Sequence, residues 1–469
     1  MQIRFCGAAQ NVTGSAHLIM LDNGFKILLD CGLYQGNEDD MEDFNRNWLF
    51  EPSEIDLVIL SHAHIDHSAR LPKLVKDGFQ GDIISTHATR SLCNIMLLDS
   101  AKIQEYEAEY HNSKELKKKG KKNLIEPLYD ASDVGEAMRR FSGLSYDRWE
   151  KIHPDVELQF RDAGHILGSA SVNLRIKEKG KEIKLGFTGD IGRPERPILR
   201  NPQPMEPCDY LICESTYGDR LHEGKPEETE HFLDIIKRTC LEKKGKLIIP
   251  AFSVGRTQEI VYMLDKLETA GRLPQIPVYV DSPLAVNATM IFGAHPECYD
   301  RELAEYMLID DNPFGFNDLT YIRSVELSKS LNHSKQPCII ISASGMMNAG
   351  RVRHHAANHL GDEKNTFLMV GYCARGTLGA LLLDGIEEVK LYGKQVPINA
   401  EIIRMGSFSA HADQNEIMDF LSNQDQLKEL YLVHGEKDAQ KVLAARMRKE
   451  KDWQVHVPEL NSLYYQGSD

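Results

Sequence analysis

Residues 55–72 read "IDLVILSHAHIDHSARLP", and this stretch decides what the first part of the chain builds. The apolar run 55–60 has the near-continuous hydrophobicity of a strand that is buried on both faces. The segment 67–78 that follows predicts a helix. A polar cluster therefore sits between the carboxyl end of a buried strand and the start of a helix.

The cluster contains His62, His64, Asp66 and His67 within six positions. Side chains at a strand end and a helix start point in different directions, so this spacing suits two neighbouring metal ions better than one. The alternative is a polar loop with surface histidines. Imidazole and carboxylate groups at this density are costly to hold together without a cation to share, which favours a metal site.

Composition limits the class of protein. The chain has 469 residues, enough for two or three domains, and its nine cysteines include no CxxC pair. The start "MQIRFCGAAQ" lacks a basic segment followed by an apolar one, and no apolar run is long enough to span a membrane. We therefore expect a soluble, reduced, cytoplasmic protein with no membrane partner. The formal charge of −15 argues against nucleic-acid binding through an overall basic surface.

One dense basic run, "KELKKKGKKN" at 114–123, follows a predicted helix over 91–115. It has two interpretations: a solvated lysine loop, or contact with a phosphate backbone. The sequence does not decide between them.

The rhythm of predicted elements changes twice along the chain. Short strand candidates separated by glycine turns occupy residues 1–218, and βα alternation typical of a mostly parallel sheet occupies 219–404. In residues 405–469 histidines again occur in loops at the ends of predicted elements, as they do in the first part. We therefore predict an α/β protein in which 219–404 form a separate domain between two parts of another.

Further histidines and carboxylates stand at the ends of apolar strands beside small residues. Singly, each is weak, because a lone histidine is more often structural and Asp before Gly is common in turns. They are Asp30, His165, Asp190, Glu214, His411 and His434.

Together with the HxHxDH stretch, this set resembles the metallo-β-lactamase fold and, within it, the β-CASP group of nucleic-acid phosphodiesterases. The resemblance covers essentially the whole chain and extends to the nuclease subunit of the cleavage and polyadenylation complex. It implies an αββα sandwich with an inserted β-CASP α/β domain. It also implies two Zn²⁺ ions per chain.

The resemblance implies a role for each motif residue. His62, His64 and His165 would bind the first zinc, Asp66, His67 and His434 the second, and Asp190 would bridge them. Asp30 would support the ligands from outside. The implied catalytic residues are Asp66, His411, Glu214 and Asp30.

The implied substrate is single-stranded RNA, because RNA-directed members of the group typically carry histidine and DNA-directed members valine at the position of His434. The implied products carry a 5′-phosphate and a 3′-hydroxyl. Two zinc ions about 3.5–4 Å apart would activate water, and His411 with Glu214 as its partner would protonate the leaving 3′-oxygen. The cutting mode, endonucleolytic or also 5′–3′ exonucleolytic, and the role in RNA processing or decay stay open.

Two glycine-containing turns, at 251–259 and 342–351, each follow an apolar strand and precede a predicted helix. They favour backbone contacts with substrate, and ordinary strand-to-helix turn chemistry is the alternative. The candidate substrate-binding residues are Ser409, His411, Arg256, Ser344, Gly345 and Arg351.

Two other functions remain as alternatives. A small-molecule zinc hydrolase of the same superfamily explains the early motifs but leaves the insertion and Glu214, His411 and His434 without a purpose. A noncatalytic scaffold is disfavoured because all seven predicted ligands are present. The oligomeric state stays open between a monomer and a homodimer.

Overall fold

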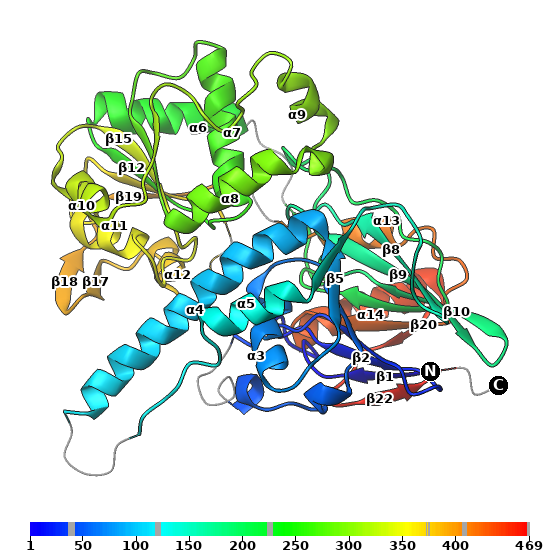
Figure 1. Cartoon of the computed structure of the whole chain (residues 1–469). Helices are drawn as coiled ribbons and strands as arrows, with labels where there is room; N and C mark the ends of the chain where they lie inside the picture. The colour runs from blue at the N-terminus through cyan, green and yellow to red at the C-terminus, as the bar shows by residue number, and fades with distance from the viewer. Residues whose placement is uncertain are drawn as a thin grey trace. The chain divides into compact units, whose positions relative to one another are not determined.

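The structure is a computed structural model that describes residues 1–35, 43–117, 123–222, 228–371, 373, 376–405 and 410–466. The chain divides into two compact units (Figure 1). Unit 1 comprises Met1–Leu221 and His411–Asp469, and unit 2 comprises His222–Ala410. Compactness does not test independent folding, so the predicted domain limits at 218 and 404 stay a prediction.

Unit 1 contains two seven-stranded sheets. The first has the order β22 (Leu463–Tyr465), β1 (Gln2–Phe5), β2 (His17–Met20), β3 (Lys26–Leu29), β4 (Leu57–Ile59), β5 (Asp82–Thr86) and β6 (Phe141–Leu144). The second has the order β21 (Gln454–His456), β20 (Glu429–Val433), β11 (Tyr210–Glu214), β10 (Lys181–Phe187), β9 (Ala170–Glu178), β8 (Val156–Asp162) and β7 (Glu150–His153).

The apolar inner faces of these two sheets form one core. Leu57 and Ile59 of β4 share a hydrophobic cluster with Phe160 of β8 and Phe187 of β10. Val58 lies between them in sequence, is also fully buried and is absent from that cluster. Because successive strand residues point to opposite faces, β4 is buried on both sides, as the run 55–60 predicts.

Helices accompany the strands of unit 1. On the second sheet, Leu443 and Met447 of a C-terminal helix share a hydrophobic cluster with Leu430 and Leu432 of β20. The helices are α2 (Ile65–Ser68), α3 (Leu71–Lys76), α4 (His87–Glu115), α5 (Ala131–Arg139), α13 (Gln414–Phe420) and α14 (Lys437–Lys451). The helix predicted over 67–78 is wrong as one element, since α2 and α3 are separate short helices with Ala69 and Arg70 between them.

Unit 2 is built on a six-stranded sheet in which all strand pairs are parallel. Its order is β14 (Leu319–Tyr321), β13 (Val278–Asp281), β15 (Cys338–Ser342), β12 (Lys246–Pro250), β16 (Thr366–Met369) and β19 (Glu401–Arg404). A separate antiparallel pair consists of β17 (Glu388–Leu391) and β18 (Lys394–Pro397). The predicted α/β class and the mostly parallel sheet of the insertion are confirmed.

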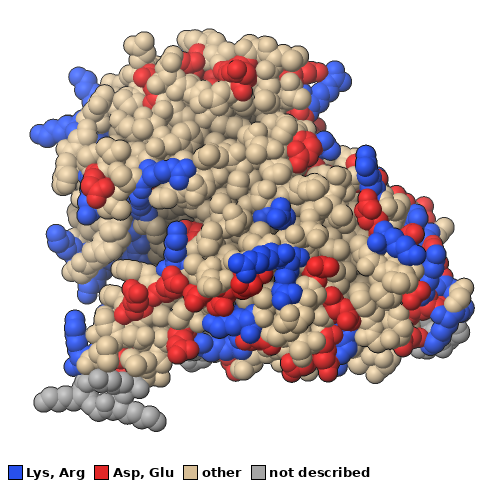
Figure 2. All heavy atoms as spheres, in the orientation of Figure 1, with Lys and Arg blue, Asp and Glu red and all other residues tan. Residues whose placement is uncertain are grey.

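Helices connect the strands of this sheet, as parallel pairing requires. They are α6 (Glu228–Ile236), α7 (Arg256–Thr269), α8 (Pro283–Ala294), α9 (Arg301–Tyr306), α10 (Val325–His333), α11 (Val352–His359) and α12 (Leu378–Leu383). Within the described residues, no helix combines the length and the apolarity that a membrane span needs. On the face drawn in Figure 2, basic and acidic side chains lie among one another.

Candidate metal centre

The predicted metal ligands come from segments far apart in sequence that unit 1 brings together. His62 and His64 follow β4, and Asp66 and His67 lie in α2. His165 lies between β8 and β9, Asp190 follows β10, and His434 follows β20. Because β10, β11 and β20 run parallel, their carboxyl ends meet at the same edge of the second sheet.

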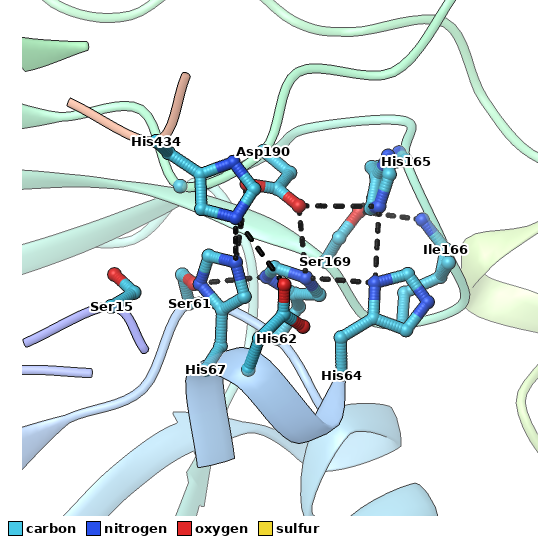
Figure 3. A network of polar contacts seen from close by, with 12 residues as sticks. Ser15, Ser61, His62, His64, His67, His165, Ile166, Ser169, Asp190 and His434 are labelled. Carbon is cyan, nitrogen blue, oxygen red and sulfur yellow. Dashed lines mark hydrogen bonds and ion pairs between the residues drawn. The ribbon is translucent and has the colours of Figure 1, made fainter. Parts of the chain in front are cut away.

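The first set of nitrogens converges on one point (Figure 3). His64 Nδ1 lies 3.1 Å from His62 Nε2 and 3.2 Å from His165 Nε2. Asp190 Oδ2 completes the group, at 3.4 Å from His62 Nε2 and 3.5 Å from His165 Nε2. These four residues can offer four ligand atoms to one ion.

The second set meets the other oxygen of the same carboxylate. His67 Nε2 lies 3.1 Å from His434 Nε2, and His434 Nε2 lies 3.4 Å from Asp66 Oδ2. Asp190 Oδ1 is 3.3 Å from His67 Nε2. Asp190 therefore turns one oxygen to each set, which is the arrangement expected of a bridging ligand.

These spacings fit zinc. Tetrahedral Zn²⁺ with bonds of about 2.0–2.1 Å places its ligand atoms about 3.3 Å apart, close to the contacts between the imidazole and carboxylate atoms. Asp190 Oδ1 is buried and accepts no hydrogen bond from any described residue. An orphaned buried carboxylate oxygen beside two imidazole nitrogens is costly unless a cation is bound there.

Outer partners set which nitrogen of each ring carries a proton. His67 Nδ1 lies 2.7 Å from Asp30 Oδ2, so its proton belongs there and Nε2 keeps its lone pair. The Ser61 hydroxyl donates to Asp30 and lies 3.0 Å from His62 Nδ1, from which it accepts. Asp30 therefore orients two of the predicted ligand histidines, His67 directly and His62 through Ser61. This agrees with the role outside the ligand set expected of Asp30.

Several outer partners were not foreseen from the sequence. The Thr216 hydroxyl donates to the carbonyl of His434 and lies 3.0 Å from His434 Nδ1, so it fixes this ring in the same way. Ser169 Oγ accepts from the backbone N–H of His165 at 3.0 Å. Ser61 and Thr216 adjoin predicted motifs, but a hydroxyl beside a motif is too common in loops to single out.

The electrostatics of the two sets differ. Burial lowers the pKa of His64 to about 3 and lowers the pKa of His165 well below its ordinary value, so both rings are neutral ligands. Burial also opposes charge on His67, but the carboxylates of Asp190 and Asp30 outweigh it and raise the pKa of His67 well above its ordinary value. When no metal ion is bound, a proton on His67 supplies the positive charge beside the Asp190 carboxylate.

His411 and Glu214 form a pair at the edge of this centre. His411 Nδ1 lies 3.3 Å from Glu214 Oε1 and 3.9 Å from Asp190 Oδ2, and its side chain is 21% exposed. Glu214 is fully buried and accepts from the backbone N–H groups of Ile191 and Thr216. Burial lowers the pKa of His411, but the Glu214 carboxylate raises it to about 9.

In the two glycine turns of unit 2, several backbone N–H groups donate hydrogen bonds to acceptors within the protein. Gly255 N–H donates to Gln258, and the N–H groups of Arg256 and Thr257 donate to carbonyls of the same turn. At the start of α11, Val352 N–H donates to the carbonyl of Ala343. These particular N–H groups are already satisfied within the turns, and substrate contact through either turn stays a prediction.

The arginines of these turns are also engaged within unit 2. Arg256 is buried and pairs with Glu259. Arg351 Nη1 donates to Asp281 Oδ1 at 2.7 Å, and its Nη2 donates to the carbonyl of Arg323 at 2.6 Å. Both side chains therefore hold unit 2 together, whatever else they do.

Arg351 belongs to a closed polar network that we call the Asp281 cluster. Asp281 is fully buried, and its Oδ2 accepts from Ser328 at 2.6 Å and lies 2.7 Å from His355 Nε2. His355 Nδ1 is 2.8 Å from Asn332 Oδ1. The Asp281 cluster consists of Asp281, Ser328, Asn332, Arg351 and His355.

The remaining predicted substrate residues are less informative. Ser344 and Gly345 are partly exposed in unit 2, and a Cβ at Gly345 would lie 3.0 Å from the Phe252 ring. Ser409 lies outside the described residues, as do residues 118–122 of the lysine run. The roles predicted for all these residues stay predictions.

Three family profiles match this chain. The metallo-beta-lactamase superfamily matches residues 11–237, the Beta-Casp domain matches 257–382, and the Zn-dependent metallo-hydrolase RNA specificity domain matches 395–458. The three matches follow the order of the motifs along the chain.

Similar proteins span nearly the whole chain. Ribonuclease TTHA0252 of Thermus thermophilus is 36% identical over 93% of this chain and 94% of its own length. The transcription termination factor FttA of Methanosarcina mazei is 30% identical over 96% of this chain and 69% of its own. Cleavage and polyadenylation specificity factor 73 of Drosophila melanogaster is 31% identical over 96% and 62%.

A solved structure of a protein of unknown function from Enterococcus faecalis V583 has the same fold. It superimposes with a TM-score of 0.55 at 12% identity and covers 99% of each chain.

Proposed function

The chain belongs to the β-CASP family of metallo-hydrolases, and we propose that it is a zinc-dependent ribonuclease that hydrolyses phosphodiester bonds of single-stranded RNA. Asp190 carries this proposal, because its two carboxylate oxygens divide between two sets of ligand atoms. A centre with this division suits a phosphodiester, on which the attacking and leaving oxygens both develop charge.

In the proposed centre His62, His64 and His165 would hold one zinc ion and Asp66, His67 and His434 the other, with one Asp190 oxygen available to each. The ions would supply an activated water and neutralise charge on the reacting phosphate. Asp30, Ser61 and Thr216 keep the ligand nitrogens unprotonated and aimed inward. The chain's own work here is orientation.

His411 is the proposed general acid. Its Nδ1 is held by Glu214, so Nε2 is the nitrogen from which a proton reaches the leaving 3′-oxygen. Against the lowering effect of burial, the Glu214 carboxylate raises the pKa of His411 and so favours its imidazolium form. The products are a 5′-phosphate and a 3′-hydroxyl.

RNA is the proposed substrate on three grounds. The RNA specificity profile matches residues 395–458, and His434 occupies the position at which RNA-directed members of the group typically carry histidine. Ribonuclease TTHA0252, of which 94% aligns with this chain, is named as a ribonuclease.

The test is a cleavage assay on matched single-stranded RNA and DNA, labelled at the 5′ end or internally. We expect RNA to be cut in preference to DNA, and the sizes of the labelled products separate internal from terminal cutting. Equal or better cutting of DNA contradicts the RNA assignment. Zinc-loaded protein that cuts neither polymer but hydrolyses a thioester or lactone supports the small-molecule alternative, and one that hydrolyses nothing supports the scaffold alternative.

His411→Ala tests the general acid. We expect metal content to be retained and RNA cleavage to fall by about 10²–10⁴-fold, with recovery on RNA whose 3′-bridging oxygen is replaced by sulfur, because a thiolate leaves without a proton. His456→Ala is the matched control: it removes a histidine of similar exposure, 24%, that pairs with Glu429 in the same unit. Failure of the sulfur substrate to rescue H411A, with metal intact, reassigns His411 to positioning.

A further inference from the structure

The distal half of α4 has no place in the proposed chemistry. This helix runs from His87 to Glu115, and seven of its nine buried side chains lie between Ala88 and Ala101. Beyond Ala101, only Ala108 and Glu115 are buried. The second half of α4 therefore exposes most of its surface.

One side of this distal half is held by the chain that returns from it. Asn112 Nδ2 donates to the carbonyl of Ile125 and Asn112 Oδ1 accepts from the Ile125 N–H, both at 2.9 Å. The backbone N–H of Leu128 donates to Gln104 Oε1 at 3.1 Å. Residues 123–130 thus fix the helix from one side.

The other side carries a row that we call the Tyr–Lys stripe. Its members are spaced by three or four residues, so they follow one face of the helix. Ile103 is 49% exposed, Tyr106 is 68% exposed and Tyr110 is 53% exposed. Lys114 continues the row within the helix, Lys117 follows in the turn after Glu115, and both are exposed. An exposed helix face is ordinarily polar, so an isoleucine and two tyrosines on it need an explanation.

The rings and the lysines are arranged together. The Tyr106 and Tyr110 rings are nearly parallel, with an interplanar angle of 11° and centroids 6.4 Å apart. Lys114 Nζ lies 4.1 Å from the centroid of the Tyr110 ring. Of the acidic residues in the distal half, Glu107 falls on the same side, whereas Glu105, Glu109 and Glu115 fall about 100° or more from the row's axis.

We propose that the Tyr–Lys stripe is an auxiliary binding site for single-stranded RNA, in which the tyrosine rings stack on bases and the lysines contact phosphates. This rests on the proposed ribonuclease function. Flat aromatic rings followed by cations are the elements of sequence-tolerant single-strand binding, since every base has a π-face and every linkage a negative charge. The charge that complements RNA comes from Lys114 and Lys117, in a protein whose net charge is −15.

The stripe is remote from the metal centre along α4. At about 1.5 Å per residue, Tyr106 lies roughly 30 Å along the helix from its first turn. That first turn is tied to the centre, because the hydroxyls of Thr86 and Thr89 donate to the carbonyl of Gly168 in the loop that carries His165. A long RNA can therefore engage both sites, and a short oligonucleotide engages the centre alone.

The first experiment compares Y106L/Y110L with Y106F/Y110F in the full-length zinc-loaded chain. Leucine keeps helix propensity and apolar surface but cannot stack, whereas phenylalanine keeps the ring. We expect Y106L/Y110L to bind long single-stranded RNA about tenfold or more weakly, to raise its KM to match, and to leave kcat and short-RNA cleavage unchanged. Y106F/Y110F should behave as wild type.

The second experiment tests the lysines through salt dependence. K114Q/K117Q should lower the slope of log affinity against log salt by about 1.4 for single-stranded RNA. The matched control, K441Q/K449Q, removes two charges from exposed positions of α14 and should leave the slope unchanged. Affinity for end-labelled RNA is read by fluorescence anisotropy, which is independent of cleavage.

Unchanged long-RNA affinity in both Y106L/Y110L and K114Q/K117Q overturns the proposal. So does a wild-type dimer, detected by sedimentation, that K114Q/K117Q dissociates while RNA affinity stays the same, because the stripe is then an interface between protein chains. A wild-type protein that binds RNA but does not cut it refutes the proposed function instead, and the binding comparison still decides the stripe.

Discussion

Two buried clusters of histidine and aspartate, one in each unit, solve the same electrostatic problem differently. In unit 2, Asp281 is neutralised by the Arg351 guanidinium, and both its oxygens have partners. In unit 1, Asp190 faces imidazole nitrogens at 3.3–3.5 Å, and its Oδ1 accepts no hydrogen bond from the described residues. A buried carboxylate paired with a permanently charged guanidinium is structural, whereas one that faces only imidazoles can accept a metal ion in place of their protons.

The difference also shows in the rings. His355 of the Asp281 cluster uses both nitrogens inside the protein, on Asp281 and Asn332. His67 and His62 use only Nδ1 on outer partners and turn Nε2 toward other ligand atoms. The type of residue is therefore a poor guide to metal binding, and the direction of the lone pairs is a better one.

Asp190→Asn gives the largest expected effect, because it removes the charge that both sets of ligand atoms share. We expect bound metal to fall to near zero. Loss of a residue that only orients a ligand typically lowers activity by about 10–100-fold, and we expect RNA cleavage by D190N to fall by more than that. The metal-free variant should be less stable than metal-free wild type, because the protonated His67 ring loses one of the two carboxylates that stabilise it. Metal analysis and thermal unfolding with chelator measure both.

A D190N protein that keeps its metal and its activity contradicts the claim that Asp190, unlike Asp281, serves metal binding. Asp281→Asn serves as the matched control, because it makes the same change at a buried carboxylate in the other unit.

Asp281→Asn should act on stability and not on metal. It leaves the Arg351 guanidinium without its charge partner, which costs about 3 kcal/mol, the lower end of the range for a broken buried pair, because Arg351 is 17% exposed. Denaturant unfolding of the zinc-loaded protein measures this cost. In a double-mutant cycle with Arg351→Gln, the two losses should not add; additive losses mean that the pair is not coupled.

Asp30→Asn tests whether outer orientation matters at the metal centre. The amide keeps its shape but offers His67 and Ser61 a weaker acceptor, so we expect zinc affinity to fall by about 10–100-fold. Competition with a zinc chelator of known affinity measures the change. Unaltered affinity indicates that the ligand rings are held by packing alone.

Asp162 represents a third solution, and its expected effect is confined to the pH dependence of stability. Its Oδ1 accepts from the Gly164 N–H, its Oδ2 has no hydrogen-bond partner among the described residues, and burial raises its pKa to about 7. Between about pH 4 and pH 7 the folded protein therefore keeps a proton on Asp162 that the unfolded chain has released. As the pH rises through this range, the free energy of unfolding falls by up to about 1.4 kcal/mol per pH unit.

Asp162→Asn should remove this pH dependence, because the amide is neutral and still accepts from Gly164. Unfolding free energies of both proteins at several pH values above about 4 give the difference. If the two proteins respond to pH in parallel, Asp162 is ionised in the folded state.

Much of unit 1 was predictable from the sequence because strand ends carry the polar residues. The run 55–60 is buried on both faces, as its continuous apolarity predicts. The strand-end placement of Asp190 and His434 also follows from their local sequence. Their convergence does not, because it depends on strand order between β10, β11 and β20, which no local pattern records.

The sequence was least informative where a side chain's partner decides its role. Arg256 and Arg351 stand at glycine turns in a way that suggests phosphate contact, yet Glu259 and Asp281 already pair with them. A positive charge near a turn predicts an anion partner without saying whether that partner is substrate or protein. The single helix predicted over 67–78 failed because it placed Pro72 inside a helix, whereas proline is favoured in the first turn, and Pro72 lies in the first turn of α3.

The central claim is that Asp190 bridges two metal ions, and metal stoichiometry tests it most directly. Wild-type protein loaded with zinc and freed of excess by gel filtration should contain close to two zinc equivalents per chain. His165→Ala and His434→Ala, which each remove a ligand from one set only, should each retain close to one. A wild-type protein that retains no more than one equivalent contradicts the claim.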